Sequence, residues 1–393
     1  MMTKYVLLFV FFFASQFSFA QDNVLWKFQT DDRVYSSPLI DKDRVYFGSG
    51  DNSFYALDKK TGKQVWVFQT NGAVHSSPAI LDDLIYFGST DGNLYAAEKN
   101  TGELVWTFQS EGEEMYDIWD YYLSDPVTHN GNVFWGSGDG YMYALDAKSG
   151  ELEWKYQTGD IIHAAPVVSD SKLYFGNYNG EFFSLDSADG SVIWKFRTIG
   201  DSYFQKGEIQ KAALVEGDAV YFGSRDYNIY ALNKNTGRGN WNRKTGSWVI
   251  STPFAYKERV FFGTSDSHIF YGANKVSGKT ELEVPVEMRV YGSAIAHNDV
   301  IYFGSFDGKV TGVDYETGKV VWEFQTQSSK ENYHNIYKEE GGFIDGFVLY
   351  DEEYMETEAK IHTLGSILST PFIDDNVIYF GSSDGYLYAV NLN

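Results

Sequence analysis

The sequence predicts an all-β protein, an eight-bladed β-propeller whose blades are four-stranded antiparallel sheets. Two observations support this fold. The spacing that begins at Ala56, Asp58, Gly62 and Trp66 returns with little variation along the chain. A β-rich run that ends in an aromatic residue and a glycine occurs eight times, at Gly48, Gly88, Gly136, Gly176, Gly223, Gly263, Gly304 and Gly381. Repeats of about forty residues that hold several short strands are typical of propeller blades.

One repeat contains four expected strands. In the first repeat, residues 36–40 supply the inner strand, 45–47 and 54–57 form a hairpin, and 65–68 form the outer strand. Most of the equivalent hairpin turns read Asp-Gly or Asn-Gly, which is a strong signal for a tight turn. The distance from the hairpin glycine to the tryptophan is 18 residues in every complete repeat except the sixth, which reaches Leu282 after 19.

The repeated tryptophans are predicted to join neighbouring blades. Each indole is expected to lie flat on the glycine turn of the next blade, since only glycine lets a ring approach the backbone so closely. We expect this structural role for Trp26, Trp66, Trp106, Trp154, Trp194, Trp241 and Trp322. The last repeat has only three strands and no tryptophan, so a strand from 22–30 is expected to complete it and close the ring.

The motif Ala-x-Asp-x-x-x-Gly-x-x-x-Trp resembles that of the PQQ-like eight-bladed propellers. This family includes PQQ-dependent alcohol dehydrogenases and the outer-membrane assembly factor BamB. The resemblance covers nearly the whole chain and implies the fold, with PQQ as an implied cofactor. Catalytic members carry an adjacent cysteine pair and a Ca²⁺ site, whereas this sequence contains no cysteine. Many unrelated activities share one propeller, so the resemblance leaves the function open.

The first twenty residues are predicted to be a signal peptide. Lys4 precedes an apolar stretch at 6–14, and Ser18-Phe19-Ala20 offers a cleavage site before Gln21. The alternative, a membrane anchor, requires a longer apolar run. We expect residues 21–393 to form a single propeller domain that is periplasmic or secreted. Without cysteine the chain has no acceptor for a lipid anchor, so we expect a soluble monomer that does not insert into membranes.

The composition excludes some partners. Lys and Arg number 31 against 54 Asp and Glu, which gives a formal net charge of −23 at pH 7. A surface this acidic repels nucleic acids and anionic lipids, so neither is an expected partner.

Three insertions interrupt the regular spacing. They lie at about 111–122, 200–211 and 327–366, in each case between the outer strand of one blade and the inner strand of the next. Such connections share one face of a propeller, so we expect that face to carry the function. The alternative, that the insertions are surface decoration, stays open. Trp119 in the first insertion is predicted to be a surface residue whose removal costs little stability.

Residues before the inner strands are expected to surround the mouth of the central channel. By register these are Arg33, Tyr35, His75, Asp160, His163, Gln210, Lys211, Trp248, Arg289 and Tyr291. The basic members suggest a site for an anionic ligand, such as a carboxylated sugar or PQQ, with tighter binding below pH ~6.5 as histidines gain charge. The alternative is that they neutralise the acidic insertions. The seven histidines show no metal-binding spacing, and we identify no catalytic residue.

Two functional hypotheses follow. The first is a scaffold that binds an anionic molecule, a carbohydrate or a protein on the decorated face without catalysis. The second is a PQQ-binding quinoprotein that oxidises a sugar or an alcohol, for example in polysaccharide utilisation. The sequence favours the first, because the cysteine pair of the catalytic relatives is missing.

Overall fold

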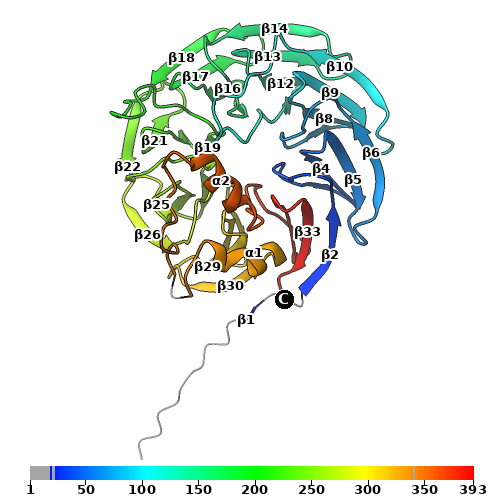
Figure 1. Cartoon of the computed structure of the whole chain (residues 1–393). Helices are drawn as coiled ribbons and strands as arrows, with labels where there is room; N and C mark the ends of the chain where they lie inside the picture. The colour runs from blue at the N-terminus through cyan, green and yellow to red at the C-terminus, as the bar shows by residue number, and fades with distance from the viewer. Residues whose placement is uncertain (1–17, 20–22, 340) are drawn as a thin grey trace, which may run out of the picture.

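In the computed structural model eight β-sheets stand around a central channel (Figure 1). The structure describes residues 18–19, 23–339 and 341–393. Most of the expected signal peptide therefore lies outside the described residues. Ser18–Phe19, its described part, forms the short strand β1, which pairs in parallel with β30 at Trp322 and Glu323.

Each blade is a four-stranded antiparallel sheet, as predicted. The strands of the first two blades are β3 (Leu39–Asp41), β4 (Arg44–Ser49), β5 (Ser53–Asp58) and β6 (Gln64–Gln69), then β7 (Ala79–Leu81), β8 (Leu84–Gly88), β9 (Asn93–Glu98) and β10 (Leu104–Gln109). The next two consist of β11 (Val127–His129), β12 (Asn132–Gly136), β13 (Tyr141–Asp146) and β14 (Leu152–Gln157), then β15 (Val167–Ser169), β16 (Lys172–Gly176), β17 (Glu181–Asp186) and β18 (Val192–Arg197).

The remaining blades repeat this order. Blades five and six comprise β19 (Leu214–Glu216), β20 (Ala219–Gly223), β21 (Asn228–Asn233) and β22 (Gly239–Lys244), then β23 (Phe254–Tyr256), β24 (Arg259–Phe262), β25 (Ile269–Asn274) and β26 (Thr280–Pro285). Blade seven comprises β27 (Ile295–His297), β28 (Val300–Gly304), β29 (Lys309–Asp314) and β30 (Val320–Gln325). The first blade's inner strand, β3, is shorter than the predicted 36–40, because Pro38 has no amide hydrogen for a ladder.

The last blade joins the two ends of the described chain. It contains β31 (Phe372–Asp374), β32 (Val377–Gly381) and β33 (Tyr386–Asn391), and β2 (Val24–Gln29) adds the fourth strand antiparallel to β33. Figure 1 shows β2 and β33 side by side. The Asn23 side-chain amide also donates to the backbone oxygen of Asn393 at 2.7 Å. The predicted closure of the ring is therefore confirmed.

Aromatic side chains fill the spaces between blades. Phe54 stacks on Phe87 with ring centroids 4.0 Å apart, and the pairs from later blades are equally close. The Trp26 ring lies against Gly62, and its Nε1 donates to the Lys59 carbonyl at 2.9 Å. Five further tryptophans of the motif repeat this geometry: Trp66, Trp106, Trp154, Trp194 and Trp241 lie against Gly102, Gly150, Gly190, Gly237 and Gly278. Trp322 does not repeat it, because the last blade has no motif glycine and the Trp322 Nε1 has no hydrogen-bond partner among the described residues.

The third insertion contains the two α-helices of the described chain. These are α1 (Gln327–Asn332) and α2 (Tyr354–His362), with a short 3₁₀ helix, η2 (Tyr333–Asn335), after α1. Figure 1 shows α2 at the inner side of the ring, beside the central channel. The structure therefore places part of this insertion over the channel.

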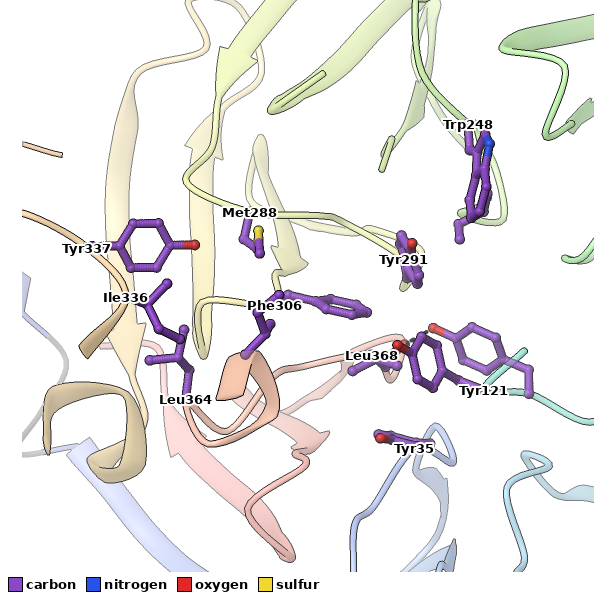
Figure 2. Close-up of a cluster of buried hydrophobic side chains, with 13 residues drawn as sticks. Tyr35, Tyr121, Trp248, Met288, Tyr291, Phe306, Ile336, Tyr337, Leu364 and Leu368 are labelled. Atoms are coloured by element: carbon purple, nitrogen blue, oxygen red, sulfur yellow. Dashed lines mark hydrogen bonds between the residues drawn. The ribbon is translucent and has the colours of Figure 1, made fainter. Parts of the chain in front are cut away.

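All three insertions contribute to one apolar cluster at the channel. The first supplies Tyr121, the second supplies Phe204 at the edge, and the third supplies Ile336 and Ile361. Figure 2 shows Tyr121 near Tyr35, Tyr291 and Leu368, which come from different blades. Because these side chains are packed in one cluster, the insertions are part of the packed fold and are not only surface loops.

Candidate functional site

The predicted channel residues separate into three groups. Arg33, Tyr35, His75 and His163 line one cavity of about 500 Å³, together with Thr90 and eight of the residues between Glu113 and Leu123. Trp248 lines a second cavity of about 530 Å³. The other five members are absent from both linings: Asp160, Gln210, Lys211, Arg289 and Tyr291.

His163 is held between two carboxylates of the first insertion. Its Nδ1 lies 2.9 Å from Asp120 Oδ2, and its Nε2 lies 2.6 Å from Glu113 Oε1. Burial opposes a charge on the ring, but Asp120 and Glu113 outweigh it and raise the pKa of His163 to about 10. His163 is therefore a charged group whose charge is already compensated.

Arg289 is compensated in the same way by the third insertion. Its side chain is fully buried, and its Nη1 donates to both carboxylate oxygens of Glu358 in α2, at 2.7 and 2.8 Å. Its Nε donates to Asp266 at 3.2 Å. For His163 and Arg289 the structure thus matches the second sequence interpretation, in which basic residues neutralise the acidic insertions.

The two remaining cations contact aromatic side chains. Arg33 Nη1 donates to the Tyr35 hydroxyl at 3.1 Å. The Lys211 ammonium lies 3.3 Å from the centroid of the Tyr122 ring. Burial lowers the pKa of Lys211 to about 8, although Asp125 partly opposes this shift.

The pKa values of the channel histidines do not support the expected strengthening of anion binding below pH ~6.5. Burial lowers the pKa of His75 to about 4, whereas the pKa of His163 is raised to about 10. Neither ring gains a proton near pH 6.5. The hypothesis that all the basic residues bind one anionic ligand together is not supported for His163 and Arg289, because carboxylates of the first and third insertions already pair with them.

The prediction that Trp119 lies in a surface loop is wrong. Its side chain is partly buried, with its ring centroid 5.8 Å from each of Trp248 and Tyr354. The first insertion folds inward because Asp120 is anchored by His163 and by the backbone amide of Tyr116. A ring placed among other aromatic rings contributes more to stability than a surface residue does.

Sequence reasoning missed Arg225, a buried residue at the centre of this network. Its guanidinium pairs with Asp117 of the first insertion, and its Nε donates to Gln210 at 2.8 Å. Gln210 in turn donates to the Tyr178 hydroxyl at 3.0 Å. A signal was present: Tyr178, Arg225 and Phe306 each stand two residues after the hairpin glycine of their blade, where other blades have small residues. Aligning the repeats by this position identifies the side chains that point into the channel.

The described residues contain no group of three or more His, Cys, Asp or Glu side chains arranged to hold a metal ion. Likewise, none of the helices in the described part is long and apolar enough to span a membrane.

Comparison with known proteins identifies the family. The family model described as outer membrane protein assembly factor BamB matches residues 16–195, 96–222 and 202–339. The chain belongs to the BamB family of PQQ-like propellers. BamB of Shewanella oneidensis is 27% identical over 134 residues, which are 34% of this chain. The matched stretch spans about a third of that relative, 33% of its length.

Solved structures share the fold. BamB from Moraxella catarrhalis superimposes with a TM-score of 0.70 at 17% identity, covering 94% of this chain and 99% of that chain. The computationally designed Ika8 protein gives 0.70 at 15% identity, with coverages of 94% and 99%. The quinohemoprotein alcohol dehydrogenase from Comamonas testosteroni gives 0.71 at 12% identity, with coverages of 95% and 78%. At these identities the likeness establishes the fold alone.

The channel residues do not fit PQQ, which carries three carboxylates. The first cavity is lined by Glu113, Glu114 and Asp120, against Arg33 and the charged His163. His163 is already paired with two of those carboxylates. A tricarboxylate placed there would add negative charge to a lining that already has a surplus of it.

Proposed function

We propose that this protein is a partner-binding scaffold in outer-membrane protein assembly, and that its partner docks on the face formed by the insertions. The observation that carries this proposal is the distribution of exposed apolar side chains. Four of the five most exposed large hydrophobic residues of the described chain lie in or beside the insertions: Met115, Ile199, Tyr203 and Met355. Clustered exposed apolar groups mark interaction surfaces.

The charge of the same surface indicates the chemical character of the partner. Glu111 and Glu114 are exposed in the first insertion, and Asp351, Glu352 and Glu353 are exposed in the third. Exposed apolar and acidic side chains on the same insertions complement a protein surface that is apolar and basic. We therefore infer a protein partner of that kind. We also infer that this protein meets its partner in the periplasm, after its own signal peptide is cleaved before Gln21.

The test is complementation in the organism that makes this protein. We expect deletion of its gene to lower the amount of folded outer-membrane proteins, and wild type to restore it. A Met115→Ser/Met355→Ser variant should restore much less, because it removes two exposed apolar contacts without touching the core. Val276→Ser is the matched control, since Val276 is 83% exposed but lies on a blade turn. Full restoration by the double variant, or no effect of deletion, would overturn the proposal.

The quinoprotein alternative has a separate test. Because the channel lining has an excess of carboxylates, we expect no absorbance shift and no dye reduction after incubation with PQQ and Ca²⁺. A stoichiometric shift with substrate-dependent dye reduction would establish the alternative instead.

A further inference from the structure

The second cavity, of about 530 Å³, is walled by aromatic rings from the three insertions and from the blades. Trp119 comes from the first insertion, Phe204 from the second and Tyr350 from the third. Trp248 and Tyr227 come from the blades. Trp248 is 7% exposed and forms the buried end, whereas Tyr350 is 53% exposed and lies at the rim.

The rings meet at steep angles, as the walls of a box do. Phe204 is inclined by 89° to Trp248 and by 74° to Tyr227. Trp119 is inclined by 80° to Trp248 and by 61° to Tyr350. Flat stacking would leave no room between the rings, whereas this arrangement leaves space that several ring faces and edges border.

The charges around this cavity favour a cation. Its lining includes Asp117 and Asp266 and holds no Lys, Arg or His. Asp117 pairs with Arg225, while Asp266 and Glu358 share Arg289, so three carboxylates face two guanidinium groups. One negative charge in this set is left uncompensated, and a cation in the cavity would reduce that excess.

A cation on one of these rings already exists. The Arg225 guanidinium lies 4.5 Å from the centroid of Trp248. The Trp248 ring therefore already forms a cation–π contact with the buried Arg225. Rings that border a water-accessible space next to carboxylates are the arrangement that recognises alkylated ammonium groups.

We propose that this aromatic cavity binds a small organic cation of the quaternary ammonium class. The positive group lies among Trp119, Phe204, Trp248 and Tyr350, with Asp117 and Asp266 supplying the compensating field. An anion would be repelled by the same carboxylates, and a strongly hydrated inorganic cation would gain less from apolar walls. Tyr203 borders both this cavity and the proposed partner surface, but the complementation test changes only Met115 and Met355, neither of which lines the cavity, so the two proposals can fail separately.

The test is a titration with choline and with 3,3-dimethylbutan-1-ol, its uncharged isostere. Calorimetry and tryptophan fluorescence follow binding, since Trp119 and Trp248 line the cavity. We expect saturable choline binding, roughly tenfold tighter than that of the isostere. Equal binding of both compounds, or no saturable binding of choline, would overturn the proposal.

Variants then locate the site. Tyr350→Leu should weaken choline binding several-fold, whereas Tyr350→Phe keeps the ring and should bind as wild type does. Tyr386→Leu is the control, because Tyr386 has a lysine over its ring but lies in the last blade, outside this cavity. Unchanged binding by Tyr350→Leu would refute the assignment. Co-sedimentation with phosphatidylcholine vesicles, with and without free choline, separates a lipid headgroup from a free solute as the source of the cation.

Discussion

At the scale of single residues, burial decides what each aromatic group contributes. Trp154 lies against Gly190 of the next blade, and its Nε1 donates to the Ser187 carbonyl at 3.2 Å. Removing this ring leaves a cavity between two sheets that cannot easily close. We expect Trp154→Ala to lower the free energy of unfolding by about 3–5 kcal/mol.

Trp119 provides the comparison for Trp154. Because it is partly buried among the insertions, we expect Trp119→Ala to cost about 1–3 kcal/mol, more than a surface residue would. Denaturant unfolding would measure both variants, because a shift of the midpoint with an unchanged m-value reports a change in the free energy of unfolding. A loss below about 0.5 kcal/mol for Trp119→Ala would mean that the first insertion is not packed in solution.

His362 makes stability depend on pH. Its ring is buried among Tyr121 and Phe306, and neither ring nitrogen has a hydrogen-bond partner within the described chain. Burial lowers its pKa to about 4 from 6.5, so protonation favours the unfolded state. Its contribution is therefore complete above pH 6.5 and falls as the pH is lowered towards 4, by at most about 3 kcal/mol.

His362→Phe removes this titration and keeps an aromatic ring in the cluster. We expect the wild type to lose more unfolding free energy between pH 7 and pH 4.5 than the variant does. Carboxylates titrate in both proteins, so the difference between the two pH profiles isolates the histidine. Parallel profiles would show that His362 is hydrated and accepts a proton freely.

At the scale of elements, one ion pair holds helix α2 over the channel. Glu358 of α2 accepts two hydrogen bonds from the buried Arg289, and the guanidinium keeps the pKa of Glu358 low despite its burial. Glu358→Gln leaves Arg289 with Asp266 as its one carboxylate partner among the described residues, beside the Tyr350 hydroxyl. We expect a loss of about 3 kcal/mol, with faster amide hydrogen exchange in 354–366. Glu353→Gln, on an exposed residue next to α2, should change neither, and equal exchange in both variants would contradict this role.

At the scale of the whole molecule, β2 closes the ring. Without it β33 has an open edge and Gly62 loses the indole of Trp26. We expect a chain that begins after residue 30 to lose at least about 3–5 kcal/mol and to aggregate.

A circular permutant is the matched control for this truncation. It would join Asn393 to Asn23 by a short linker and open the exposed turn at Gly217, so that all eight blades stay complete. We expect it to unfold at a temperature close to that of the parent, as measured by calorimetry. A permutant as unstable as the truncated chain would show that the order of the strands, not closure, stabilises the ring.

The sequence by itself determined the propeller, the number of blades and the closing strand. Each blade contacts its neighbours through positions that recur with the repeat, such as Trp66 and Gly102. The spacing of the repeat therefore predicts which residues of neighbouring blades pack together. It also identified the insertions and most of the residues near the channel.

Only the tertiary structure decided how those residues are used. Glu358 is 69 residues from Arg289 and 237 from Tyr121, and no periodic pattern predicts which insertion side chain reaches which blade. Charge state followed from these contacts: His163 became a fixed cation between two carboxylates, whereas His75 became a neutral ring. Buried electrostatics depends on partners within a few ångströms, and for non-repeated segments the three-dimensional packing alone sets those partners.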